Sequence, residues 1–125
     1  MPEVSCPPKR PLPRSTMFVY KIFLPPQWAD FESLGVFRGA PIDLRDGYLH
    51  LSSAGQVEET ANLHFADHEV IVVARIPEVG LNADLVWETS RGGAEFPHLY
   101  GELSLAEVND HWEVIREKGR FSIDA

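Results

Sequence analysis

Apolar residues in this chain occur in short blocks that are bounded by glycine, proline or polar residues. Residues 17–24, MFVYKIFL, are almost entirely apolar, and residues 69–77, EVIVVARIP, are a continuous run of mainly β-branched residues. Both runs predict buried strands, and the second is typical of a central strand that is covered on both faces. Three further segments combine aromatic and β-branched residues and predict additional strands: 83–90, 96–103 and 111–118.

Two segments have the features of short helices. Residues 25–35, PPQWADFESLG, place proline in the first turn and Gly35 at the end. Residues 53–67 carry Ser53 in an N-cap position, with Gln56 three residues later as its capping-box partner. One face of this second helix is apolar at the helical spacing, through Val57, Ala61 and Phe65.

The segments between the two helices predict a loop and a strand. Residues 36–47 mix Gly, Pro and Asp with scattered apolar residues, which indicates an ordered loop that covers a site. Residues 48–53, YLHLSS, then predict a short strand. About five or six strands and two short helices in the N-terminal half favour an α+β fold over a doubly wound sheet, because only the first half alternates strand with helix.

Length and composition indicate one ordinary globular domain. The chain has 125 residues, of which 44% are hydrophobic and 24% charged. Residues 1–16 contain five of the ten prolines and no apolar periodicity, so we expect a flexible tail before a single domain at 17–125. The one cysteine, Cys6, lies in this tail and excludes an internal disulfide. No signal core or membrane-spanning run is visible, so we expect a cytoplasmic protein without a membrane partner.

The charge balance narrows the class of partner. The chain carries a formal net charge of −8, and the tail is the basic part of it. The domain is therefore more acidic than the chain as a whole. Because it lacks a clustered basic face, we expect no nucleic-acid partner and instead a small molecule or a protein.

The predicted strand at 48–53 carries the first candidate site. Side chains alternate between the two faces of a strand, so Tyr48, His50 and Ser52 share one face. The chain then enters the predicted helix at Ser52–Ser53, where free amides and the helix dipole favour a phosphate or carboxylate. His50 is suited to bonding a sugar hydroxyl or to acid–base chemistry. The structural alternative is a half-buried histidine that precedes an ordinary helix cap.

The second candidate is FPHLYG, where the same alternation places His98 and Tyr100 on one face. If this strand lies near residues 48–53, the two His–Tyr pairs form the walls of one cleft. The alternative is a structural edge strand with Tyr100 packed over the core.

The third candidate is WETSRGG, residues 87–93. Arg91 is suited to clamping a phosphate, Trp87 to stacking on a ring, and the two glycines to close backbone approach. Glu88 is the acid that we consider first in this segment. The alternative is a solvated turn with an incidental arginine.

Other chemistries find little support. His64 and His68 have the i, i+4 spacing of a zinc site, with Asp67 and either Asp30 or Glu58 as oxygen donors. The chain has no His-Glu-x-x-His motif, however, so we predict no metal site. A nucleophilic hydrolase would need more than Ser52 or Ser53 near His50, because Gly-x-Ser-x-Gly is absent. The chain also lacks a P-loop and a Gly-x-Gly-x-x-Gly motif after a strand.

Three stretches together resemble a known family: VYKIF with Trp28, GAPIDLRDGYLHLSSAGQVEETANLHFA, and LVWETSRGGAEFPHLYGELSLAEV. They are similar to the family called domain of unknown function 952, a set of small, mostly bacterial proteins, over about residues 18–110. This resemblance implies the fold of the ADP-ribosyltransferase superfamily, a split antiparallel β-sheet pair that grips NAD. YLHLSS also resembles the His-x-His-Leu-Ser stretch of the RNA 2′-phosphotransferases, with Tyr48 in place of the first histidine.

The resemblance also implies roles for residues toward NAD. Tyr20 or Lys21 would offer a polar contact from the first core strand, Ser52 would orient the nicotinamide ring or its carboxamide, and Ser53 would add a hydroxyl donor. His50 would hold ribose hydroxyls, Tyr48 or Tyr100 would stack on nicotinamide, and Arg91 would meet the pyrophosphate. The acid would be Glu88 or Glu102, or His98 in its place.

The activity implied is that of an NAD-dependent transferase, in which the nicotinamide–ribose bond breaks through an oxocarbenium-like state. Two alternatives remain open. The first is a non-catalytic module that binds a nucleotide-like ligand, and the second is a structural or protein-binding domain. Fold resemblance alone does not establish an activity.

Overall fold

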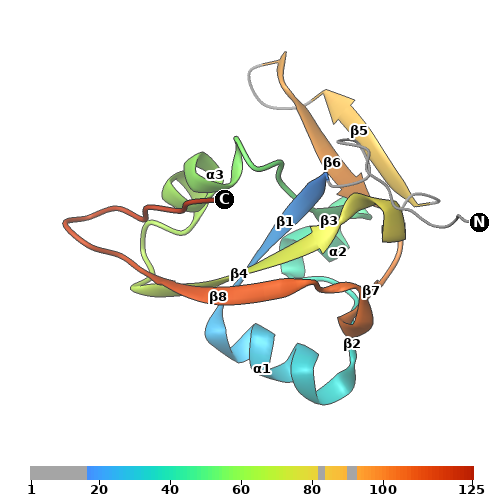
Figure 1. Cartoon of the computed structure of the whole chain (residues 1–125), viewed down its shortest axis with the longest axis horizontal. Coiled ribbons are helices and arrows are strands. Elements are labelled where there is room, and N and C mark those ends of the chain that lie inside the picture. The colour runs from blue at the N-terminus through green and yellow to red at the C-terminus, as the bar shows by residue number, and fades with distance from the viewer. Residues whose placement is uncertain (1–16, 82–83, 90–92) are drawn as a thin grey trace, which may run out of the picture.

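The computed structural model describes residues 17–81, 84–89 and 93–125, which form an α+β fold (Figure 1). The elements follow one another as β1 (Phe18–Phe23), α1 (Pro25–Leu34), β2 (Val36–Phe37), α2 (Pro41–Asp46), β3 (Leu49–His50), α3 (Val57–His64), β4 (Val70–Pro77), the 3₁₀ helix η2 (Glu78–Leu81), β5 (Leu85–Thr89), β6 (Glu95–Leu99), β7 (Leu103–Ser104), the 3₁₀ helix η4 (Leu105–Glu107) and β8 (Asp110–Ile115). None of the described helices is long and apolar enough to cross a membrane.

The strands form three small antiparallel sheets, in the orders β1-β4-β8, β2-β7 and β3-β6-β5. The prediction that residues 69–77 form a central strand is confirmed, because β4 pairs with β1 on one side and with β8 on the other. The α+β class is likewise confirmed. The described residues, however, contain three sheets and three α-helices, where we expected a split pair of sheets and two helices.

Two hydrophobic clusters lie on the two faces of the β1-β4-β8 sheet. Alternate residues of β1 point to opposite faces, so Val19 and Phe23 join the cluster that contains α1, while Ile22 joins the cluster that contains α3. Phe23 is fully buried and stacks on Phe31 of α1 with ring centroids 5.4 Å apart. Burial of each such side chain stabilises the fold by about 1.5–3 kcal/mol. The continuous apolar sequence of β4 follows from this double coverage.

Helices α1 and α2 begin in the same way. Each has proline in its first turn, and the residue at N3 accepts a hydrogen bond from the N–H of the residue before the helix. Gln27 Oε1 accepts from Leu24 N–H at 2.9 Å, and Asp43 Oδ2 accepts from Ala40 N–H at 2.8 Å. The prediction of a loop over 36–47 was therefore wrong, because six residues are too few for α2 to show a helical period.

Two further boundaries differ from the predictions. The helix expected from residue 53 begins at Val57, after a turn at residues 54–56. The predicted pairing of Ser53 with Gln56 is present, because the Ser53 N–H donates to Gln56 Oε1 at 3.0 Å. The strand expected at 96–103 ends at Leu99, and β7 then pairs with β2 in a separate sheet.

Residues 49–52 connect two of the sheets. The Leu51 N–H donates to the Pro97 carbonyl at 3.1 Å, which extends the pairing of β3 with β6. One residue later, Ser52 and Tyr20 exchange two backbone hydrogen bonds of 2.7 and 2.8 Å, which attach the same segment to β1. Side chains from β1, β3 and β6 therefore meet at this crossing.

Candidate functional site

The histidines of the two predicted His–Tyr pairs lie on neighbouring strands, with Tyr48 just before β3 and Tyr100 just after β6. In the antiparallel pairing of β3 with β6, His50 is directly opposite His98, and their ring centroids are 5.8 Å apart. The Tyr48 ring stacks on His98 at 4.0 Å with an interplanar angle of 21°. Tyr48 also lies 4.8 Å from His50 and 5.2 Å from Tyr100. The two pairs thus form one continuous aromatic and polar surface. They lie side by side on one sheet, whereas we expected them to form the two walls of a cleft.

Both ring nitrogens of His50 contact carboxylates of α2. Nδ1 lies 2.7 Å from Asp43 Oδ1, and Nε2 lies 3.0 Å from Asp46 Oδ2. An imidazole ring has two N–H donors only when it is protonated, so the cationic ring satisfies both contacts at once. Since both nitrogens are engaged within the protein, a ligand that used His50 would have to displace one carboxylate.

Asp43 is the centre of a buried polar network. Its side chain is 1% exposed and lies 3.1 Å from the Lys21 ammonium, itself 6% exposed. The same carboxylate accepts backbone N–H groups of Ala40 at 2.8 Å and of His50 at 3.0 Å. Lys21 also donates to the His50 carbonyl at 3.1 Å. One side chain therefore holds α2 against both β1 and β3.

The pKa of Asp43 reflects opposing effects. Burial acts to raise it, but the hydrogen bond from the His50 ring, the charge of Lys21 and the two backbone N–H donors together hold it well below its usual range. Burial lowers the pKa of Lys21, and Asp43 partly counteracts this effect. The ammonium of Lys21 is thus paired with Asp43, and the contact with NAD that the resemblance implied for Tyr20 or Lys21 stays a prediction.

The second histidine, His98, has a different arrangement. Its Nδ1 lies 2.6 Å from Glu88 Oε1, and the Tyr100 hydroxyl donates to the same oxygen at 2.8 Å. These two hydrogen bonds, that from His98 first, lower the pKa of Glu88, and the bond to Glu88 raises the pKa of Tyr100. Burial, together with the charges of Asp46 and Glu88, raises the pKa of Tyr48. Carboxylates therefore surround the aromatic surface.

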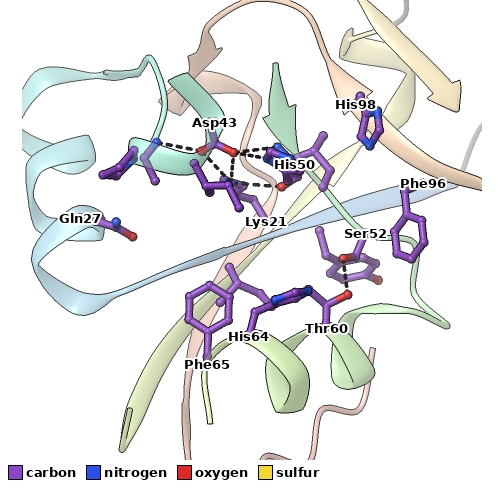
Figure 2. A pocket seen from close by; sticks show the side chains of 16 residues that line it. Lys21, Gln27, Asp43, His50, Ser52, Thr60, His64, Phe65, Phe96 and His98 are labelled. Carbon is purple, nitrogen blue, oxygen red and sulfur yellow. Dashed lines mark hydrogen bonds and ion pairs between the residues drawn. The ribbon is translucent and has the colours of Figure 1, made fainter. Parts of the chain in front are cut away.

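A cavity of about 370 Å³ opens beside this surface. Figure 2 shows Lys21, Asp43 and His50 along one wall, with Ser52, Thr60, His64 and Phe65 opposite and His98 and Phe96 at one end. The volume lies within the range of small-molecule pockets, roughly 300–1,000 Å³. The wall is completed by Tyr20, Ile22, Gln27, Ala40, Pro41, Ile42 and Leu51. The cavity thus combines apolar sides with a few polar groups, which is the usual composition of a ligand site.

The other predicted site residues take several positions. Ser52 is buried in the cavity wall and donates to Thr60 Oγ1 at 3.3 Å, whereas Ser53 does not line the cavity. Tyr20 is buried in the wall, with its ring edge-on to Trp112. Tyr48 and Tyr100 lie beside the cavity, against the histidines. Arg91 lies outside the described residues.

Trp87 and Glu102 do not belong to the site. The Trp87 indole lies against the α1-side core and donates to Glu78 Oε2 at 2.8 Å, so it is not a stacking surface for a ligand there. Glu102 pairs with Arg38 at 2.7 Å on the exposed surface. In the part of the chain that the structure describes, no group of three or more His, Cys, Asp or Glu side chains is arranged to hold a metal ion.

Sequence reasoning missed Asp43, Asp46 and Thr60. The signal for Asp43 was the pattern of Pro41 followed two residues later by an acid, which is typical of a helix start. That pattern indicates only a cap. The second role of Asp43, between Lys21 and His50, required the tertiary structure.

The fold and site define a small α+β domain with one polar face at a cavity. Residues 22–111 match the model of a family described as Protein of unknown function (DUF952), so the chain belongs to this family, as the resemblance indicated. Protein CC0527 from Caulobacter crescentus, known from a crystal structure, is 37% identical with a TM-score of 0.81, and the match covers 84% of this chain and 93% of that chain. Its solution NMR structure matches at 36% identity and a TM-score of 0.75, over 83% of this chain and 90% of that chain. No curated protein matches the sequence.

Proposed function

We propose that this domain binds the nucleoside part of NAD or ADP-ribose in the cavity beside the surface formed by β3 and β6. The observation that carries the proposal is that His50 and His98 both line a cavity of about 370 Å³ with their ring centroids 5.8 Å apart, while the Tyr48 ring stacks on His98 beside the cavity. A ribose ring needs hydrogen-bonding groups for its hydroxyls, and an attached base needs apolar or aromatic surface. The cavity supplies both.

The charges near the cavity suit the nicotinamide end of such a ligand. Burial raises the pKa of the Tyr48 hydroxyl, and the negative charges of Asp46 and Glu88 raise it further. A nicotinamide ring carries positive charge when it is joined to ribose, and positive charge also develops on the sugar when that bond breaks. Nearby carboxylates and tyrosine faces stabilise positive charge.

The described cavity wall does not offer a free cation for phosphates. Among the described lining residues, Lys21 is the one lysine or arginine, and its ammonium is paired with Asp43. The pyrophosphate would therefore lie outside this wall. Arg91, which we expected to meet it, remains a prediction because it lies outside the described residues.

A second candidate function is transfer of the ADP-ribosyl or glycosyl group on an ADP-ribosyltransferase-like fold. The Glu88–His98 pair at the cavity supports it, since transfer needs a positioned acid or base near the ribose. A non-catalytic binding module would bind the same ligand without releasing nicotinamide.

Calorimetric titration of the full chain with NAD and with ADP-ribose tests the proposal. We expect saturable binding that weakens about tenfold or more in His98→Ala, because a lost hydrogen bond and lost packing each reduce affinity. His68→Ala is the matched control, since His68 is exposed and does not line the cavity. A folded wild-type chain that binds neither compound would refute the proposal, and nicotinamide release on incubation with NAD would favour the transferase over the binding module.

A further inference from the structure

His98 is a buried histidine with only one of its ring nitrogens bonded within the described protein. The residue is 5% exposed and lines the cavity. Nδ1 contacts Glu88 Oε1 at 2.6 Å, but Nε2 has no hydrogen-bond partner among residues 17–81, 84–89 and 93–125. A buried polar atom without a partner is unfavourable, and in native proteins it commonly marks a place where another molecule bonds.

The partner of Nδ1 decides which nitrogen carries the proton. An ionised carboxylate accepts hydrogen bonds and cannot donate them, so Nδ1 must be the N–H donor to Glu88. The Tyr100 hydroxyl also donates to this oxygen at 2.8 Å, so Glu88 Oε1 acts as an acceptor toward both groups. The Nε2 atom of the neutral ring then carries a lone pair and acts as an acceptor.

The neighbouring histidine cannot take this role. Both nitrogens of His50 already contact carboxylates, at 2.7 and 3.0 Å, so that ring has no free acceptor. The Tyr48 ring, stacked at 4.0 Å, restricts rotation of the His98 ring. Of the two opposed histidines, which both line the cavity, His98 is therefore the one with a ring nitrogen left unbonded within the described residues.

We infer that Glu88 holds His98 as the Nδ1–H tautomer and that Nε2 accepts a hydrogen bond from a hydroxyl or N–H group of the ligand in the cavity. This deepens the proposed function and rests on it for the ligand, whose ribose hydroxyl would be the donor. Glu88 is a positioning residue in this arrangement. The site should then reject ligands that lack the donor, because they leave Nε2 buried and unpaired.

The first test needs no ligand. In the full chain labelled with ¹⁵N, the histidine ring nitrogens are assigned by NMR at a pH where His98 is neutral. We expect the Nδ1–H tautomer for His98 in the wild type and in Tyr100→Phe, which keeps the carboxylate, and loss of that preference in Glu88→Ala. The Nε2–H tautomer in the wild type, or an unchanged tautomer in Glu88→Ala, would overturn the inference.

The second test uses ADP-ribose as the probe in the same spectra. We expect the Nε2 resonance of His98 to move toward the position of a hydrogen-bonded acceptor at saturation, and we expect Glu88→Ala to weaken binding about tenfold. Binding of ADP-ribose that leaves this resonance unchanged would overturn the inference while the proposed function stands. If ADP-ribose does not bind, the proposed function fails, and the tautomer in the ligand-free chain alone decides whether Glu88 positions His98.

Discussion

Replacement of Asp43 by asparagine should destabilise the whole domain. The substitution keeps the shape of the side chain and one acceptor oxygen for the backbone N–H groups, but it removes the charge that faces Lys21 at 3.1 Å. Because the two side chains are 1% and 6% exposed, water cannot replace the lost partner. Removal of one member of a buried ion pair costs about 3–5 kcal/mol. We therefore expect Asp43→Asn to lose about 3 kcal/mol of unfolding free energy.

Urea denaturation followed by tryptophan fluorescence and far-UV circular dichroism measures this loss. The slope of the unfolding free energy against urea concentration should not change, because the surface exposed on unfolding stays the same. The melting temperature should fall by about 10 °C or more. Asp46→Asn is the matched control on the same helix, and it should lose only a small fraction of this amount because Asp46 lies at the solvent-accessible end of the network.

A double substitution separates the ion pair from other effects of Asp43. Lys21→Met removes the buried ammonium, so Asp43→Asn should cost clearly less in that background than in the wild type. The coupling between the two positions should be on the order of 2 kcal/mol. Two outcomes would refute the idea that the buried network holds α2. One is an Asp43→Asn protein that is as stable as the wild type. The other is a double variant whose loss of unfolding free energy equals the sum of the losses in the two single variants.

Two further predictions concern the same helix. The pKa of Asp43 is lower in the folded chain than in the unfolded chain, so its contribution to stability is complete above the pKa of an unfolded aspartate, near 4. This contribution should decline as the pH falls below that value. Urea midpoints measured over a series of acidic pH values should show the decline in the wild type and a smaller one in Asp43→Asn. Gly39→Ala should destabilise the domain by about 1–3 kcal/mol, since Gly39 has φ of 135° and a Cβ there would lie 3.0 Å from Asp43 Cβ. Gly55→Ala is the control, because the structure has open space and an ordinary φ there. The urea midpoint of Gly39→Ala should lie below that of Gly55→Ala, and equal midpoints would contradict the prediction.

Local sequence patterns predicted the elements whose residues carry their own signal. The β-branched run of β4 predicted a central strand because burial of both faces requires apolar residues at every position. The Pro25–Gly35 boundaries predicted α1 because proline suits a first turn and Gly35 adopts a left-handed φ of 78°. Alternation also placed Tyr48 with His50, since a strand has a period of two. In contrast, α2 was too short to show a period.

The sequence by itself therefore determined the main strands, the first helix and the shared face of each His–Tyr pair. Only the tertiary structure decided that His50 lies opposite His98, that Glu88 orients one ring, and that Asp43 joins Lys21 to the other. Periodicity reports which side chains share a face of one element, because it depends on neighbours along the chain. The partners in this site come from separate elements, and their pairing depends on sheet register and on how α2 packs over β1 and β3.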